Sequence, residues 1–182
     1  DDFSAHHADG NFQQTSAAGR LRAGQGIEVE YLGVQENGTI VAGALFETHH
    51  SRLSTFSVVH DGPLCDYRDR ELTEYFMTQL KQHAKAKGSA QMEIVPEMPY
   101  CLHDSRGGEL PADQGGAPAD DAVETLKNLG FMHDGFTIGY TAVPRWRYLK
   151  DLTGITDEKS LLKSYDKRTQ WSVKRAASMG VH

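Results

Sequence analysis

The stretch IEVEYLGVQENGTIVAGALFETHH, residues 27–50, carries the clearest fold signal in this sequence. Apolar and polar residues alternate on both sides of Asn37-Gly38, as they do in strands that bury one face. Asn-Gly is also the dipeptide that a two-residue hairpin turn prefers. We therefore predict a β-hairpin over residues 27–50 with its turn at Asn37-Gly38.

Helical and strand patterns flank this hairpin on both sides. Residues 69–88 space their apolar side chains three and four apart, with acids at the start, lysines near the end and a closing glycine, which predicts an amphipathic helix. Residues 10–26 predict a helix capped near Asn11. Further strands are expected over 52–64 and 90–96.

The second half of the chain alternates loop, helix and strand signals. Residues 103–121 are a loop by composition, 122–130 predict a helix, 131–152 predict one or two strands, and a last helix is expected over 156–180 with Thr156 as its cap. This order indicates a layered α/β (α+β) fold with a central mixed sheet, compatible with an acyltransferase-like domain.

Positive charge is concentrated near the end of an otherwise acidic chain. The formal net charge is −6, yet the segment 163–175 contains five basic residues and one acidic residue. On one continuous helix they would lie opposite an apolar side formed by Leu162, Tyr165, Thr169, Val173 and Ala176, with Trp171 among the cations. A single basic helix on an acidic body indicates a specific anion site. The five basic residues are Lys163, Lys167, Arg168, Lys174 and Arg175.

Several phrases together resemble the Fem (FemABX) family, whose members are aminoacyl-tRNA-dependent peptidyltransferases that build the interpeptide bridge of peptidoglycan. The resemblance covers nearly the whole chain, in family order and spacing. Its phrases are NFQQT (11–15), GPLCDYRDRELTEYF (62–76), IVPEMPY (94–100), NLGFMHDGFTIGY (128–140), RWRYLKDL (145–152) and DKRTQWSVKRAASMGV (166–181).

The resemblance implies two GNAT-like domains, with the first over residues 1–152 and the opening helix of a second over 153–182. It implies transfer of an amino acid from aminoacyl-tRNA to a lipid-linked or nucleotide-linked (UDP-linked) muropeptide. No cofactor is expected beyond aminoacyl-tRNA as co-substrate. The sequence has neither a secretory signal nor an apolar run long enough to span a membrane, so we expect a cytoplasmic protein, with peripheral contact at the inner membrane face left open.

The family motifs also imply acceptor-binding residues. A basic residue follows the F-x-Q-T helix in the family, which places Arg22 in that role, with Arg20 as a weaker candidate. DKRTQW matches a basic phosphate-binding stretch, which points to Lys167 and Arg168. The ordinary alternative for all of these cations is a solvated charge on a helix surface.

Two departures from the family pattern fall on the expected acceptor side. Relatives commonly read N-R-G-P where this chain reads HDGP, so His60 and Asp61 replace an amide and an arginine. Val95 stands where relatives have an acid. Strand alternation places Glu93 on the same face as Val95, so Glu93 is a candidate substitute. We therefore include His60, Asp61 and Glu93 among the expected substrate-binding residues and leave the catalytic residue unassigned.

Two other functions compete with this interpretation. An acyl-coenzyme A N-acyltransferase would share the fold, but RAGQG (22–26) precedes a strand and not the helix that a pyrophosphate loop opens. A non-catalytic RNA-binding module would need a broad basic surface with interleaved aromatics, and only one helix qualifies.

Metal binding and cysteine chemistry are not expected from the sequence. The pairs His6-His7 and His49-His50 have no cysteine or acidic partner recurring at metal-ligand spacing, so we predict no metal site. With no sign of export, Cys65 and Cys101 are expected to be reduced thiols. Cys65 is a poor nucleophile candidate because the neighbouring Asp66 raises its pKa.

Overall fold

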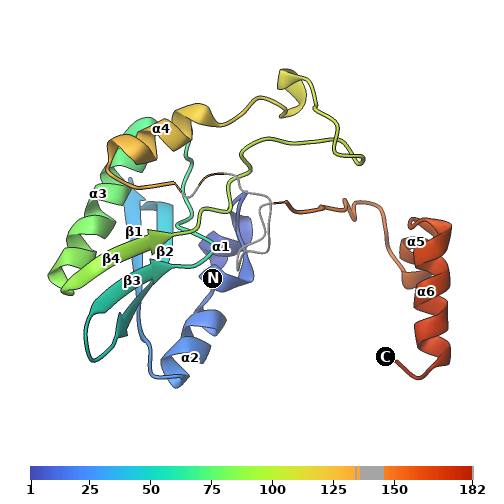
Figure 1. The fold of residues 1–182 in the computed structure, drawn as a ribbon, viewed down its shortest axis with the longest axis horizontal. Helices are drawn as coiled ribbons and strands as arrows, with labels where there is room; N and C mark the ends of the chain where they lie inside the picture. Colours follow the sequence, from blue (N-terminus) through green and yellow to red (C-terminus); the bar gives the residue numbers. More distant parts are fainter. Residues whose placement is uncertain (134, 136–145, 182) are drawn as a thin grey trace. The chain divides into compact units, whose positions relative to one another are not determined.

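The structure is a computed structural model that describes residues 1–133, 135 and 146–181. The chain divides into two compact units, Asp1–Gly135 and Phe136–His182, and each is described by itself (Figure 1). The second unit contains α5 (Glu158–Lys163) and α6 (Lys167–Ser178). The first unit contains α1 (Asp2–His6), η1 (Phe12–Gln14), α2 (Ser16–Gly24), β1 (Glu28–Glu36), β2 (Thr39–His50), β3 (Thr55–Val59), α3 (Arg70–Ala86), β4 (Ser89–Ile94), η2 (Ala112–Gln114) and α4 (Asp120–Asn128).

The predicted hairpin is confirmed. Strands β1 and β2 pair antiparallel, and Glu36 lies opposite Thr39 at the end of the ladder. Asn37 and Gly38 form the turn with φ values of 49° and 85°. Both lie in the left-handed region that a tight hairpin turn requires, which explains the Asn-Gly dipeptide.

The sheet is mixed, as the sequence analysis predicted. Its strand order is β1-β2-β3-β4, with antiparallel pairing between the first three strands and parallel pairing between β3 and β4. A parallel pair needs a crossover connection, and α3 lies in the chain between β3 and β4. The predicted amphipathic helix therefore has a clear structural role, and the layered α/β fold is confirmed.

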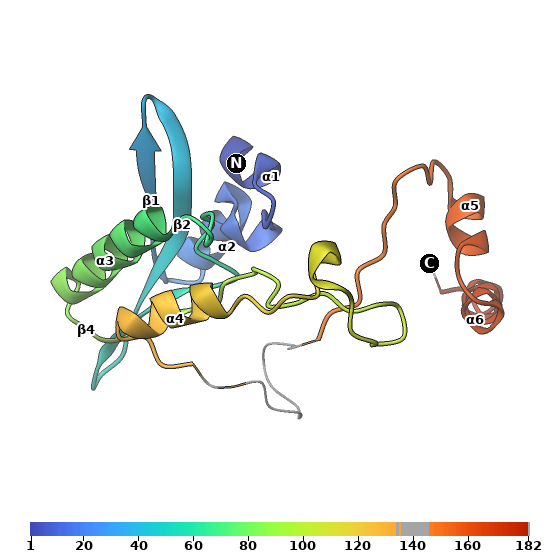
Figure 2. The ribbon, with the colours of Figure 1, turned by 90° about the horizontal axis from the view of Figure 1, so that it is seen from above.

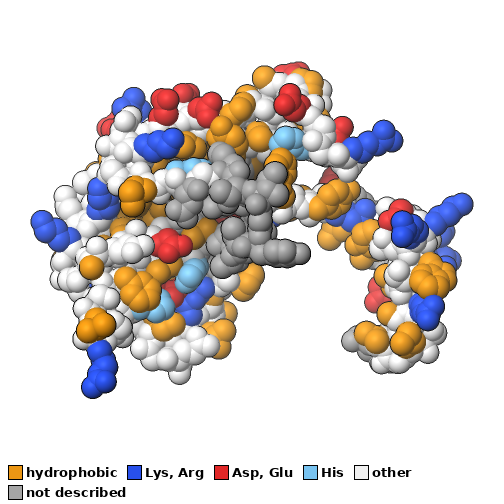
Figure 3. All heavy atoms as spheres, in the orientation of Figure 1, with side chains coloured by type: hydrophobic (Ala, Val, Ile, Leu, Met, Phe, Trp, Pro, Cys, Tyr) orange, Lys and Arg blue, Asp and Glu red, His pale blue; other side chains and the backbone are white. Residues whose placement is uncertain are grey.

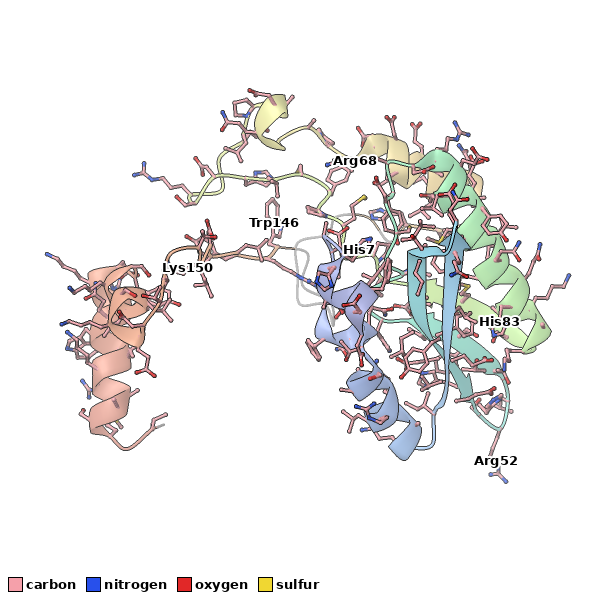
Figure 4. The ribbon with its side chains drawn as sticks, turned by 180° about the vertical axis from the view of Figure 1, so that it is seen from behind. His7, Arg52, Arg68, His83, Trp146 and Lys150 are labelled. Carbon is pink, nitrogen blue, oxygen red and sulfur yellow. The ribbon has the colours of Figure 1, made fainter. Side chains whose placement is uncertain are left out.

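The two faces of β2 contact different helices. Phe46 belongs to the main hydrophobic core with Phe76 and Met77 of α3, and its ring meets His83 edge-on with 5.1 Å between ring centroids. On the opposite face, Gly43 leaves room for the Phe3 ring of α1. Figure 2 shows α3 on one side of the sheet and α1 and α2 on the other, and Figure 4 labels His83 on α3.

Two predicted helices are each interrupted in the structure. The predicted helix over 10–26 divides because Thr15 adopts an extended conformation, ending η1, and caps α2 by accepting a hydrogen bond from Ala18 N. The predicted last helix over 156–180 divides because the extended Asp166 accepts hydrogen bonds from the backbone N–H groups of Arg168 and Thr169. That contact starts a new helix at Lys167.

This break makes two predictions about the last segment wrong. The cap of α5 is Asp157, which forms a capping box with Ser160, and not Thr156. The expected apolar side does not form along one helix, since Leu162 and Tyr165 precede α6 and Val173 is 47% exposed.

The strands predicted over 131–152 fall largely on residues 134 and 136–145, which lie outside the described residues. The described parts of that range, residues 131–133, 135 and 146–152, contain no strand. Among the helices that the structure describes, none combines the length and apolar character that crossing a bilayer requires.

The core makes a quantitative prediction with a matched control. Leu80 on α3 is 1% exposed and Leu53 in the β2–β3 turn is 97% exposed. Leu80→Ala should lower the free energy of unfolding by about 2–5 kcal/mol, through lost burial and a residual cavity. Leu53→Ala should change it by less than about 0.5 kcal/mol. Urea denaturation of both variants measures this, and equal effects would contradict the assigned core.

Candidate functional site

The motif NFQQT positions the turn at His60 and Asp61 through side-chain hydrogen bonds to the backbone. Asn11 Nδ2 donates to the carbonyl of Asp61 over 2.7 Å, and Gln14 Nε2 donates to the carbonyl of His60. Gln14 also accepts from Leu45 N through Oε1 over 2.7 Å. This short segment therefore ties the turn after β3 to the middle of β2.

A buried ion pair lies beside this turn. Glu47 on β2 is 1% exposed, and its Oε1 lies 2.7 Å from Nε of Arg22, whose side chain is 12% exposed. Arg22 also donates to the backbone and side-chain oxygens of Gln13. The Glu47 contact is ionic but falls outside hydrogen-bond geometry, so Oε1 keeps acceptor capacity that no described hydrogen bond uses.

Two imidazoles contact the other oxygen of the same carboxylate. His49 Nε2 lies 3.0 Å and His60 Nε2 lies 3.8 Å from Glu47 Oε2. The His49 ring stacks on Phe56 with 4.8 Å between centroids and 6° between planes. Figure 3 shows histidine, acidic and basic side chains gathered on one face of this unit. Glu47 therefore has three nitrogen-bearing side chains around it.

Strand register places Glu93 on the same face as this cluster. Glu47 pairs with Val58, and Val58 pairs with Glu93, so the three residues form a row across β2, β3 and β4. Paired residues point to the same side of a sheet, and two strand spacings put the backbones of Glu47 and Glu93 about 10 Å apart. Glu93 lines an open depression of about 310 Å³ together with Phe56 and Gln91.

The cations of α6 occupy the first turn of that helix in the second unit. Lys167 and Arg168 line a depression of about 300 Å³ with Trp171 and Ser172. Arg175 lies over the Trp171 ring, 5.1 Å from its centroid. Figure 3 shows basic and hydrophobic side chains together on this segment.

Hydrogen bonds lower the pKa of the Asp166 carboxyl, chiefly the one from the Thr169 hydroxyl, followed by those from the Thr169 and Arg168 N–H groups. Asp166 therefore stays ionised and caps this helix down to acidic pH.

The structure thus brings some of the predicted site residues together. Arg22, His60 and Glu93 share one face of the sheet in the first unit. Asp61 is adjacent to them but has a φ of 48°, and its carbonyl is held by Asn11. Glu47 is not among the site residues predicted from the sequence. The available signal was its position two residues before His49 on a predicted strand, which places both side chains on one face.

The environment of Cys65 excludes it as a nucleophile, as expected, but for a different main reason. Burial, more than any other factor, raises the pKa of the Cys65 thiol to about 12, and the charge of Asp66 contributes less. A thiol with that pKa is almost entirely protonated at neutral pH.

A model of the FemAB family matches residues 1–182. The chain belongs to the FemAB family. Aminoacyltransferase FemA of Staphylococcus aureus (strain bovine RF122 / ET3-1) is 29% identical over 180 residues, which is 94% of this chain and 40% of that protein. The protein of the same name from strain MW2 is 28% identical with the same coverage. This FemAB-family chain therefore spans about two fifths of the length of these curated relatives.

A solved structure supports the fold. The crystal structure of FemX matches with a TM-score of 0.70 and 20% identity, covering 97% of this chain and 40% of that one. At this level of identity the likeness shows the fold of this FemAB-family chain.

The buried ion pair predicts a strong and specific stability effect. Glu47→Gln removes the negative charge beside Arg22 and leaves a buried guanidinium uncompensated, which should cost about 3 kcal/mol or more. The matched control is Glu74→Gln in the exposed Arg70–Glu74 pair, where Nε and Oε1 are 2.6 Å apart. That change should cost less than about 1 kcal/mol. Chemical denaturation of both variants tests this, and equal losses would contradict the role of Glu47.

Proposed function

We propose that this protein transfers an amino acid from aminoacyl-tRNA to the stem peptide of a peptidoglycan precursor and so builds the interpeptide bridge. The observation that carries the proposal is the FemAB family match over all of residues 1–182. The aminoacyltransferase names of its relatives agree with it. Because the chain covers two fifths of those relatives, the whole activity is proposed and not assigned.

The chemistry mainly requires two large substrates to be positioned. An aminoacyl ester is already activated, so attack by the acceptor amine needs correct placement and a route for the departing proton. The acceptor, whether lipid-linked or UDP-linked, has a pyrophosphate. Cations that can approach that group are therefore central to the proposal.

Lys167 and Arg168 are the first candidates for contacts to the pyrophosphate. The helix dipole disfavours cations in a first turn, and neither residue makes an ion pair within the described part of the chain. A bound phosphate would be favoured by the charges of both cations, whereas the first N–H groups of the helix are already bonded to the Asp166 carboxylate. The adjacent Trp171 offers an aromatic face for a sugar or a base.

Arg22 is the second candidate for a contact to the pyrophosphate, although some of its N–H groups are already used within the protein. Its two terminal nitrogens each donate one hydrogen bond to Gln13, and its Nε lies 2.7 Å from Glu47 Oε1 outside hydrogen-bond geometry. Each terminal nitrogen keeps a second N–H, and this pair suits a bidentate contact with phosphate oxygens. We also propose that His60, Asp61 and Glu93 contact the bound acceptor.

The domain organisation and the cellular location of the protein are also proposals. Residues 1–152 form a first GNAT-like domain, and residues 153–182 open a second one. The protein acts in the cytoplasm without a cofactor other than aminoacyl-tRNA as co-substrate, and with a lipid-linked acceptor it would contact the inner membrane face peripherally.

The rival acyl-coenzyme A activity has less support from the local geometry. RAGQG lies at the carboxyl end of α2 and leads into β1, whereas pyrophosphate binds at helix amino ends. A non-catalytic RNA-binding module is the other alternative, and basic side chains next to an exposed aromatic occur here on α6.

The deciding assay offers the full-length gene product charged tRNAs together with lipid-linked or UDP-linked muropeptide and measures the mass of the product. Addition of one or more amino acids to the stem peptide is expected. Transfer from acetyl-coenzyme A in place of aminoacyl-tRNA would exclude the proposal.

The α6 depression makes a specific prediction about acceptor affinity. A charge-assisted contact contributes roughly 1.5–3 kcal/mol, so Arg168→Ala should weaken acceptor binding by about tenfold to a hundredfold. Acceptor affinity should also fall with added salt, and less steeply in the variant. Calorimetric titration with the UDP-linked precursor measures both effects.

Lys174→Ala is the control, because Lys174 is basic and on the same helix but does not line the depression. It should leave acceptor affinity within about twofold. If both variants lose acceptor affinity equally and tRNA binding also falls, α6 is a diffuse RNA-facing surface and not a pyrophosphate site.

A further inference from the structure

Three potential metal ligands converge beside the β3 turn. One ligand atom from each of Glu47, His49 and His60 lies within 4.8 Å of the other two. Nε2 of His49 and Nε2 of His60 are 3.0 and 3.8 Å from Glu47 Oε2. A tetrahedral ion with bonds of about 2.0–2.1 Å holds its ligand atoms about 3.3 Å apart. We propose that Glu47, His49 and His60 form a binding site for Zn²⁺.

The backbone, and not the reach of flexible side chains, brings these residues together. Glu47 and His49 are two residues apart on β2, so they point to the same face of the sheet. Val58 of β3 pairs with Glu47, and the turn that follows β3 brings His60 Nε2 to 3.8 Å from Glu47 Oε2. The site therefore needs only small side-chain rotations to close around an ion.

Neighbouring contacts hold each ligand in place. Arg22 fixes Glu47 through Oε1 and leaves Oε2 directed at the imidazoles. Phe56 stacks on His49, and Gln14 binds the backbone carbonyl of His60. Contacts of this kind set the orientation of metal ligands and commonly contribute tenfold to a hundredfold in metal affinity.

The ligand types select among metal ions. Two imidazole nitrogens and one carboxylate oxygen suit Zn²⁺, whereas Mg²⁺ and Ca²⁺ prefer all-oxygen ligands. The charge of Arg22 partly offsets that of Glu47, so the bound ion should exchange readily. Side chains of His49 and His60 are partly exposed, which leaves a fourth position open to water or to an oxygen of a ligand.

The test uses Zn²⁺ alone with the unmodified chain and its variants, so it does not depend on the proposed transferase function. Competition with a colorimetric chelator should show one zinc at this site, and zinc should raise the melting temperature. Mg²⁺ and Ca²⁺ should not. His49→Gln and His60→Gln should each weaken zinc binding by at least about tenfold to a hundredfold.

His50→Gln is the matched control. His50 adjoins His49 in sequence but faces the other side of β2, where its Nε2 lies 3.0 Å from Glu28. This variant should bind zinc like the unmodified chain. Zinc binding that is absent in the unmodified chain, or unchanged in both His49→Gln and His60→Gln, would overturn the proposal.

A second measurement covers the case in which a variant fails to fold. Co²⁺ added to the unmodified chain should give the intense visible absorption of a four-coordinate nitrogen and oxygen site, and Zn²⁺ should abolish it. A spectrum that stays that of hydrated Co²⁺ would equally overturn the proposal.

Discussion

The carboxylate of Glu47 needs a cation beside it, and this requirement organises one whole face of the sheet. An isolated charge buried to this degree would cost several kcal/mol, so Arg22 must lie against β2. Arg22 belongs to α2, whose start is fixed by Thr15 and whose preceding turn includes Gln13. The ion pair thus fixes where α2 lies on the sheet.

The same constraint extends to the turn after β3. Gln14 connects Leu45 of β2 to the carbonyl of His60, and Asn11 holds Asp61. A polar side chain buried with both of its amide atoms bonded specifies one arrangement of its neighbours. The phrase NFQQT therefore has a structural role through its hydrogen bonds to the backbone, in addition to any role in recognising substrate.

The elements that could be predicted from the sequence are those decided locally. The hairpin follows from alternation and from Asn37-Gly38, and α3 follows from its apolar spacing and capping residues. The meeting of Glu47 with Arg22 and His60 could not be predicted, because it depends on strand pairing and on how α2 packs. The break at Asp166 has a local signal that the prediction from sequence missed. An aspartate can accept hydrogen bonds from the N–H groups two and three residues later, so it caps a helix at least as well as a threonine does.

Arg22 and the α6 cations present two different electrostatic situations. The charge of Arg22 is largely balanced by Glu47, so Arg22 offers directed N–H groups and a weak net field. Lys167 and Arg168 have no ion-pair partner in the described chain and stand in solvent, where salt screens a charge beyond about 8 Å at physiological ionic strength. For the acceptor binding proposed above, the salt dependence should therefore arise from the α6 cations, whereas geometric discrimination among anions should arise from Arg22.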